Sequence, residues 1–257
     1  MMRLDKFLCE TGFGTRSQVK TLLKKGLVWV NGEPAKGPEQ KVREEEDQVI
    51  CEGRQAVYMS FAYLMLHKPA GVVSATEDRK ERTVLDLLDV PYKKKLFPVG
   101  RLDKDTEGLL LLTDDGELAH KLLSPKRHVD KTYYAEVSGE VTKEHIRQFR
   151  EGLSIGEKRP TLPAVLQIRK SGSVSEVQVT IHEGKYHQIK RMFESIGCQV
   201  LYLKRLSMGS LMLDETLMPG EYRMLTKGEI QALKEETETK SVGQRTMERQ
   251  RGALQRS

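Results

Sequence analysis

A segment of nine residues, 100–108 (Gly-Arg-Leu-Asp-Lys-Asp-Thr-Glu-Gly), places several ionisable side chains between two glycines. The apolar run 109–112 follows directly and predicts a buried strand. Loops at the ends of core strands are where protein scaffolds commonly place reactive groups. A carboxylate there, such as Asp103, can act as a nucleophile or base if water is partly excluded and a nearby cation favours its charged form. A solvated surface loop is the alternative explanation for these charges.

Residues 182–193 (His-Glu-Gly-Lys-Tyr-His-Gln-Ile-Lys-Arg-Met-Phe) form a second candidate segment. Gly184 predicts a turn between a strand and a helix, and the helix begins with basic side chains. Because helix N-termini favour anions, this cationic start favours a bound phosphate or carboxylate. An exposed basic helix without a ligand is the alternative.

Lys131-Thr-Tyr-Tyr134 opens a further predicted strand with two aromatic residues. Aromatic residues in strands usually belong to the core. A tyrosine can also stack on a base while its hydroxyl group holds a polar partner.

Several other familiar sites are absent from the sequence. There is no phosphate-binding loop ending in Gly-Lys-Ser/Thr and no Gly-x-Ser-x-Gly motif. His182 and His187 are one residue too far apart to share a zinc ion from one helical face. The six histidines are scattered and the three cysteines lie far apart, so the sequence offers no metal cluster and favours reduced thiols in a cytosol.

The composition favours a soluble protein. The 257 residues carry a formal net charge of +6, which permits a polyanionic partner. No apolar run approaches the roughly 20 residues that cross a bilayer. The first residues lack the apolar core of a signal peptide. We therefore expect a cytoplasmic protein with no membrane partner.

Residues 1–56 are predicted to form a small module with a linker. Helices are expected over residues 3–10 and from Thr15, followed by a strand at 27–30 and an Asn31-Gly32 hairpin turn. Residues 1–31 hold six basic and two acidic side chains, whereas residues 33–52 hold three basic and seven acidic ones. This separation predicts a cationic face on the first helices.

Residues 57–236 are predicted to form a larger domain. Strands are expected at 61–66, 108–113, 133–137 and 174–181, with helices at 84–88, 117–123 and 188–196. Strands followed by helices, with several hairpins, indicate an α+β fold. Residues 237–257 contain no aromatic side chain, and we expect a polar, basic, disordered tail.

Taken in order, these segments resemble the motif series of the pseudouridine synthases. The resemblance rests on 67–71 (His-Lys-Pro-Ala-Gly), 100–113, 131–133 and 183–192. Residues 3–49 are similar to the S4 RNA-binding module, through Arg3-Leu-Asp-Lys, Thr15-Arg-Ser, Gly26, Val28 and Asn31-Gly32. The resemblance implies an S4-like α/β module joined to a catalytic domain with a mixed, mainly antiparallel sheet.

The resemblance also implies a reaction, the isomerisation of uridine to pseudouridine without cofactor or metal. Asp103 matches the essential aspartate, which either attacks the ribose C1′ or removes a 2′ proton; both routes stay open. Lys190 matches the basic residue that pairs with this aspartate, and Tyr133 matches the tyrosine under the target base. Arg101 matches the residue thought to fill the gap that a flipped uridine leaves.

The implied partner is ribosomal RNA, either free or within an assembling small subunit, and we expect a monomer. Phosphate contacts from a separate basic module would offset part of the free energy of base flipping. The expected RNA-binding residues of the two domains are Arg101, His187, Gln188, Arg191, Arg3, Arg16, Ser17, Lys20, Lys24 and Lys25.

The Lys-Arg-Met ending of the 183–192 motif resembles the branch that modifies small-subunit (16S) ribosomal RNA. Large-subunit relatives tend to show Asn-Arg-Gln in this context, so a 23S ribosomal RNA target is the first alternative. A non-catalytic S4-type RNA-binding or ribosome-assembly protein is a second. A glycoside hydrolase using Asp103 and Asp105 is a third, which the flanking cations disfavour.

Overall fold

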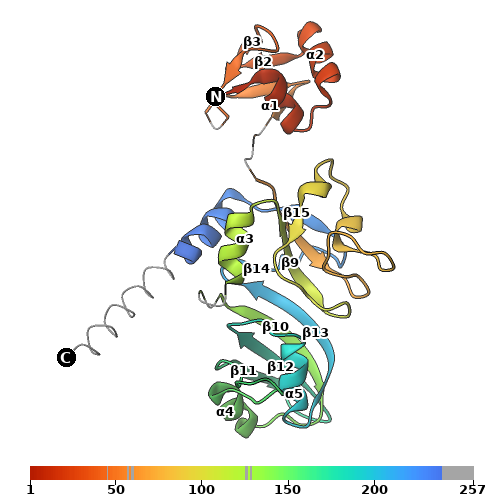
Figure 1. The fold of residues 1–257 in the computed structure, drawn as a ribbon, viewed down its shortest axis with the longest axis vertical. Coiled ribbons are helices and arrows are strands. Elements are labelled where there is room, and N and C mark those ends of the chain that lie inside the picture. The colour runs from red at the N-terminus through yellow and green to blue at the C-terminus, as the bar shows by residue number, and fades with distance from the viewer. Residues whose placement is uncertain (45, 57, 59–60, 125–126, 128, 239–257) are drawn as a thin grey trace, which may run out of the picture. The chain divides into compact units, whose positions relative to one another are not determined.

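The computed structural model describes residues 1–44, 46–56, 58, 61–124, 127 and 129–238. The chain divides into two compact units, Met1–Phe61 and Ala62–Ser257 (Figure 1). The domain boundary that we place after residue 56 stays a prediction. Residues 237 and 238, expected in the polar tail, end a helix that spans 227–238. The rest of the expected tail, 239–257, lies outside the described residues.

The N-terminal unit packs two helices against short strands. Its helices are α1 (Leu4–Glu10) and α2 (Arg16–Lys24), and the Thr15 and Gln18 side chains cap α2 reciprocally. Apolar side chains of α1 and Val19 of α2 face the core, whereas the opposite side of α2 is exposed. The strands are β1 (Met2–Arg3), β2 (Val28–Val30), β3 (Glu33–Pro34), β4 (Lys41–Val42), β5 (Val49–Cys51) and β6 (Arg54–Ala56).

Within the described residues, the larger unit is built on a nine-stranded sheet in the order β11-β12-β10-β13-β9-β7-β15, with β14 paired to β13 and β8 to β9. Among the described residues, the strand pairs of this sheet are antiparallel except β13 with β9, so the expected α+β fold with a mainly antiparallel sheet is confirmed. The strands are β7 (Tyr63–Lys68), β8 (Phe97–Pro98), β9 (Glu107–Thr113), β10 (Lys131–Ser138), β11 (Val165–Lys170), β12 (Val174–Ile181), β13 (Gln199–Met208), β14 (Leu211–Met212) and β15 (Tyr222–Met224).

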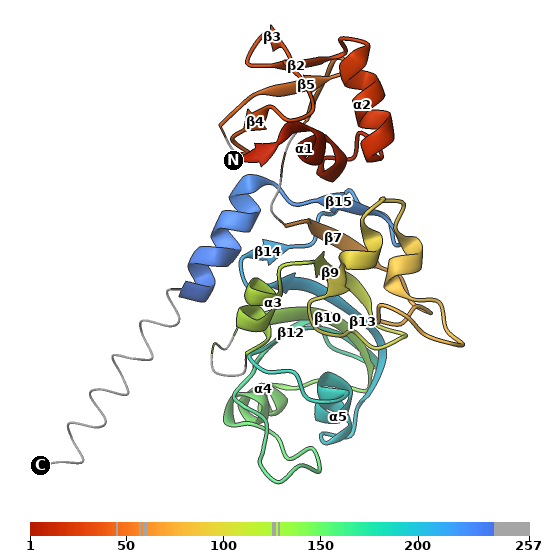
Figure 2. The same cartoon turned by 45° about the horizontal axis from the view of Figure 1, so that its top comes forward.

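The central strands β7 and β9 bury both faces. Successive side chains of a strand alternate between faces, and the two faces here join different apolar clusters. Leu110 and Leu112 join a cluster with Phe149 and Phe193, while Leu109 and Leu111 join one with residues of α3 and of 227–238. The helices are α3 (Gly116–Leu123), α4 (Lys143–Glu151) and α5 (Gln188–Glu194), with short 3₁₀ turns at Val84–Leu87 and Lys93–Lys95. Figure 2 shows α4 and α5 beside the half of the sheet that contains β10 to β13.

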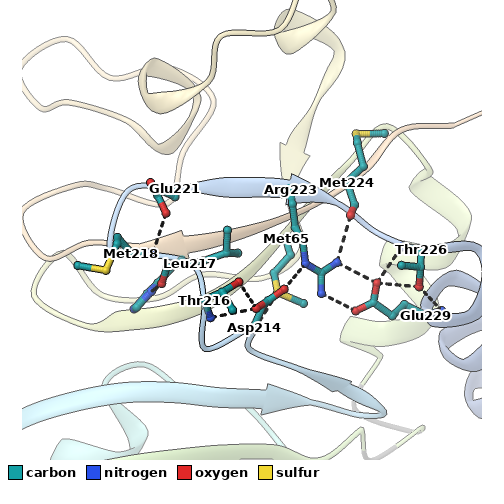
Figure 3. A network of polar contacts seen from close by, with 11 residues as sticks. Met65, Asp214, Thr216, Leu217, Met218, Glu221, Arg223, Met224, Thr226 and Glu229 are labelled. Carbon is teal, nitrogen blue, oxygen red and sulfur yellow. Dashed lines mark hydrogen bonds and ion pairs between the residues drawn. The ribbon is translucent and has the colours of Figure 1, made fainter.

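A charged network fixes the C-terminal helix to the sheet edge. Arg223 of β15 donates through Nε to Asp214 (2.6 Å) and through Nη1 and Nη2 to Glu229 (2.9 and 2.8 Å) (Figure 3). Thr216 and Thr226 add hydrogen bonds to these two carboxylates. One guanidinium group therefore connects β15, the 214–217 segment and the helix at 227–238.

Candidate active site

The loop 100–108 is anchored by a buried lysine. Lys68, at the end of β7, is 0% exposed and donates from Nζ to the carbonyl oxygens of Pro69 (3.0 Å), Lys104 (3.2 Å) and Thr106 (2.8 Å). Burial lowers the pKa of Lys68 to about 8, against the opposing effect of nearby carboxylates. Three acceptors for three donors satisfy this ammonium group, and they fix the backbone on both sides of Asp105.

Two further contacts define the path of the loop. Ser74 Oγ donates to the carbonyl oxygen of Leu102 (2.9 Å) and accepts from its amide (3.1 Å). At the other end, Gly108 has a φ of +102°, and a Cβ there would lie 2.2 Å from the carbonyl oxygen of Arg205. A glycine is required at this close approach of β9 to β13. Asp103 is thus held between two fixed ends.

Lys190 of α5 lies beside both aspartates of the loop. Its Nζ is 3.3 Å from Asp103 Oδ2 and 2.7 and 2.8 Å from the two carboxylate oxygens of Asp105. Burial acts to raise the pKa of Asp105, but the hydrogen bond and charge of Lys190 outweigh it and the pKa is lowered. Burial likewise acts to lower the pKa of Lys190, and the two aspartates raise it. The sequence predicted Lys190 beside Asp103; Asp105 is the closer partner.

His187 covers the other oxygen of Asp103. Its Nε2 lies 3.6 Å from Asp103 Oδ1, and its ring stacks on Tyr186 with centroids 3.8 Å apart. The backbone of His187 is left-handed, with φ of 47°, which is uncommon for a residue other than glycine. This turn aims His187 at the carboxylate and leaves Tyr186 75% exposed.

Tyr133 completes the site from the sheet. It is 7% exposed and lies on β10, where a register shift between Thr132 and Tyr133 disturbs the pairing with β13. Such bulges re-aim side chains near functional sites. A cavity of about 90 Å³ and a larger one of about 570 Å³ are both lined by Tyr133, Asp103, His187 and Arg101, and Lys190 lines the smaller.

Two of the expected RNA contacts have structural partners. Gln188 is buried, accepts from the amide of Lys185 (2.9 Å) and donates to Glu183 (3.1 Å). Arg191 donates to Glu157 (2.9 Å) and to the carbonyl oxygen of Ile155. These bonds fix the turn before α5 and the 155–157 segment. Arg101, by contrast, is exposed at the cavities.

The expected RNA-binding residues of the N-terminal unit also include one with protein partners and others that are exposed. Arg3 is engaged by Asp5 (2.9 and 3.0 Å) and Glu39 (3.1 Å). The other expected residues of this unit are exposed on α2 or directly after it: Arg16, Ser17, Lys20, Lys24 and Lys25.

Three residues of the site are not predicted by the sequence. Lys68 appears there only as part of a motif, although a lysine ending an apolar strand is a usable signal. Asp105 appears only as the second carboxylate of the hydrolase alternative, and its two-residue spacing from Asp103 is the available hint. Arg205 lines the larger cavity from β13, a strand that was not predicted.

The described residues hold neither a metal-binding cluster nor a membrane-spanning helix. No group of three or more histidine, cysteine, aspartate or glutamate side chains in that part of the chain could hold a metal ion. Among the same residues, no helix has the length and apolar character to cross a membrane.

Asp103, Lys190 and the buried Tyr133 therefore surround one cavity of the larger unit. The sequence pattern of the RNA pseudouridylate synthase family matches residues 62–195, and that of the S4 domain matches residues 2–49. An uncharacterized RNA pseudouridine synthase of Bacillus subtilis (strain 168), YtzG, is 48% identical over 237 residues, covering 91% of this chain and 99% of the relative.

Ribosomal small subunit pseudouridine synthase A of Vibrio cholerae serotype O1 is 44% identical over 233 residues, covering 90% of this chain and 99% of the relative. A crystal structure of a pseudouridylate synthase matches with a TM-score of 0.64 and 40% identity, over 91% of this chain and all (100%) of that one. The chain belongs to the RNA pseudouridylate synthase family, and its N-terminal unit carries an S4 domain.

Proposed function

We propose that the protein isomerises one uridine of 16S ribosomal RNA to pseudouridine, with Asp103 as the reacting carboxylate. The observation that carries this proposal is the position of Asp103. It lies 3.3 Å from the Lys190 ammonium group and lines the same cavity as Tyr133. A partly enclosed carboxylate beside a cation, with an aromatic ring to receive a base, suits this chemistry.

Support for the small-subunit target comes from the relatives. Several proteins named ribosomal small subunit pseudouridine synthase A match at 41–44% identity along 98–99% of their length. The Lys190-Arg-Met192 ending of the α5 motif agrees with this branch. A 23S target is the alternative within the family.

Each residue has a proposed part in the reaction. Asp103 either bonds to C1′ or removes the 2′ proton, and the C1′–N1 bond breaks with its electron pair left on the base. Lys190, whose pKa is raised, stays charged beside the carboxylate. The Tyr133 ring holds the detached base until C5 bonds to C1′. In that step the Asp103–C1′ bond breaks, or the removed proton returns to C2′, and the C5 proton then leaves to solvent. Arg101, exposed at the cavity, takes the place of the flipped uridine.

We also propose that the protein acts as a cytoplasmic monomer without cofactor or metal. Ribosomal RNA, free or in an assembling small subunit, is its partner. The exposed basic residues of α2 would bind phosphates, because lysine and arginine contacts to phosphate supply most sequence-independent affinity.

The test is release of tritium from RNA labelled at C5 of uridine, under single-turnover conditions. The parent should release tritium from 16S RNA, and Asp103→Asn should bind RNA equally but release less than about one part in a thousand of the parent rate. Asp105→Asn is the matched control and should retain more activity than Asp103→Asn. Equal release by parent and Asp103→Asn would overturn the assignment; binding without release by the parent would indicate a non-catalytic RNA-binding protein.

A further inference from the structure

Arg205 is a buried cation that the proposed reaction does not use. It is 2% exposed, and its Nε donates to the carbonyl oxygen of Leu109 (2.8 Å). Its Nη2 is buried and has no hydrogen-bond partner within the part of the chain that the structure describes. A buried donor left unpaired is destabilising by about 1–3 kcal/mol, more if charged. Unpaired buried groups are rare in native proteins, so this one indicates a missing acceptor.

The position of Arg205 follows from the strand register. It is opposite Tyr133 of β10 on one side and Gly108 of β9 on the other. Directly opposed residues of antiparallel strands place their side chains on one face. Arg205 therefore lies beside the tyrosine that would carry the base, and the strand that bears it also fixes the end of the Asp103 loop.

The larger cavity joins these groups. Its volume is about 570 Å³, and Arg205, Tyr133 and Asp103 all line it. Two other cations of the site have acceptors, since the partly buried Lys190 donates to Asp105 and the buried Lys68 donates to three carbonyl oxygens. Arg205 alone of these three has a buried nitrogen without a partner among the described residues.

We propose that Arg205 is a further catalytic residue, which binds a carbonyl oxygen of the flipped uracil and stabilises the negative charge that the base acquires. This inference rests on the proposed function. When the C1′–N1 bond breaks, its electron pair stays on N1 and is shared with the O2 and O4 oxygens. A positive donor beside those oxygens lowers the barrier because the charge develops where the donor already lies.

A backbone phosphate is the other oxygen acceptor that RNA offers. Two observations favour the base. Arg205 is buried beside Tyr133, whereas the cations suited to phosphates, Arg101 and Lys104, are exposed on the same cavity. A phosphate in the buried position would also require desolvation of a full charge.

The test compares uridine with 5-fluorouridine at the target position. Fluorine withdraws electrons and stabilises the uracil anion by itself, so the fluorinated base depends less on a protein donor. Single-turnover loss of the starting nucleoside is followed by chromatography of digested RNA with saturating full-length enzyme. The ratio of the 5-fluorouridine rate to the uridine rate is taken on one preparation, so it does not depend on the folded fraction.

We expect Arg205→Met to raise this ratio at least about tenfold over the parent, with Arg205→Lys in between. Lys131→Met, which removes another cation lining the same cavity, is the matched control and should keep the parental ratio. An unchanged ratio in both Arg205 variants would overturn the inference. With an unchanged ratio, a lower RNA affinity of the Arg205 variants would indicate that Arg205 binds a phosphate. Parental affinity and parental rates on both nucleotides would indicate a structural role. A parent without turnover on uridine would contradict the proposed function itself.

Discussion

Lys190 shares one ammonium group between two aspartates, and this arrangement determines the charge of the site. Its Nζ is within 3.3 Å of Asp103 and within 2.8 Å of both Asp105 oxygens. Two carboxylates two residues apart would repel each other without a shared cation. Lys190 therefore does more than balance Asp103: it keeps Asp105 charged and so fixes the loop against α5.

Lys190→Met should raise the pKa of Asp105. Burial acts to raise this pKa, and the lysine is the main group that lowers it. Without the lysine, burial is opposed only by the smaller effects of a backbone hydrogen bond and of His187. Turnover should fall about 100-fold, as when one stabilising donor is removed from a site. Lys190→Arg keeps the positive charge and should keep the pKa of Asp105 low, although the forked guanidinium group would shift both carboxylates. Carboxyl NMR titration checks the pKa, and an unshifted Asp105 in Lys190→Met would show that the lysine does not control it.

Asp103, Tyr133, Lys190, Arg101 and His187 could be picked out of the sequence because each belongs to a recognisable motif, and all five line one cavity. The sequence did not place Arg205 or the Lys68 contacts. Those positions depend on which strands pair and in which register, and pairing over 97 positions between Gly108 and Arg205 is not visible in local residue patterns.

At the scale of elements, the Asp103 loop is fixed by groups outside it. Lys68 holds three carbonyl oxygens, and Gly108 allows β9 to approach β13. Both groups lie at ends of strands, so the sheet itself determines the position of the carboxylate. These contacts restrict the conformations open to a highly charged loop.

Lys68→Met should weaken both activity and stability. Removing the buried ammonium group leaves three carbonyl oxygens without a donor, at about 1–3 kcal/mol for each that stays dry, and the loop relaxes toward water. We expect a loss of roughly 3 kcal/mol in the free energy of unfolding, by urea titration. Single-turnover rates should fall more than 100-fold. Rates within twofold of the parent would show that Lys68 does not position the loop.

The Arg223 network should make stability fall in acid. Hydrogen bonds from Thr216 and Arg223 lower the pKa of Asp214 to about 2, and the bond from Arg223 lowers that of Glu229 to about 2. Both folded values lie below the unfolded ones, so the stabilisation is complete above about pH 4.5 and is lost as the pH falls toward 2.

Arg223→Met should therefore lower the melting temperature by about 5 °C at pH 7. This gap, the difference in melting temperature between parent and variant, should disappear as the pH falls from about 4.5 to about 2. Calorimetry at several pH values measures this gap. A gap that stays constant over that range would mean that the network's charges do not contribute. Arg147→Met, which removes an exposed pair on α4, is the control and should change little at any pH.

In the larger unit the sequence predicted the central strands and most helices. It missed α4, the helix at 227–238 and the strands β8, β11, β13, β14 and β15. Lys204 and Arg205 interrupt the apolar pattern of β13, and the pairing of this strand with β9 and β10 determines its position. Helix 227–238 has many charged residues and is held by Leu233 in the core and by the Arg223 network. Tertiary contacts decide both elements, so local patterns were insufficient.

At the scale of the whole molecule, an S4 unit with an exposed basic helix accompanies the catalytic unit. Binding through phosphates is sensitive to salt, because each contact releases counterions from the RNA. We therefore expect the basic residues of α2 to contribute to the salt dependence of RNA binding, without affecting the catalytic step.

Lys20→Gln combined with Lys24→Gln should weaken RNA binding and reduce the salt slope by about 1.5, since each lost contact contributes roughly 0.7–0.9. The matched control is Lys36→Gln with Lys41→Gln, which removes two exposed charges from the acidic part of the same unit and should leave the slope unchanged. Titrations by fluorescence anisotropy at several salt concentrations measure both. Equal slopes for the two double variants would exclude α2 as the binding face.

The central claim is that this chain makes a pseudouridine in 16S ribosomal RNA through Asp103. Pseudouridines should be mapped at single-nucleotide resolution in 16S and 23S RNA from a strain lacking the gene, complemented with the parent or with Asp103→Asn. We predict that one 16S site is lost in the deletion, restored by the parent and not restored by Asp103→Asn at equal protein level. A site lost only from 23S RNA would move the target to the large subunit. Restoration by Asp103→Asn, or no site lost from either RNA, would contradict the account.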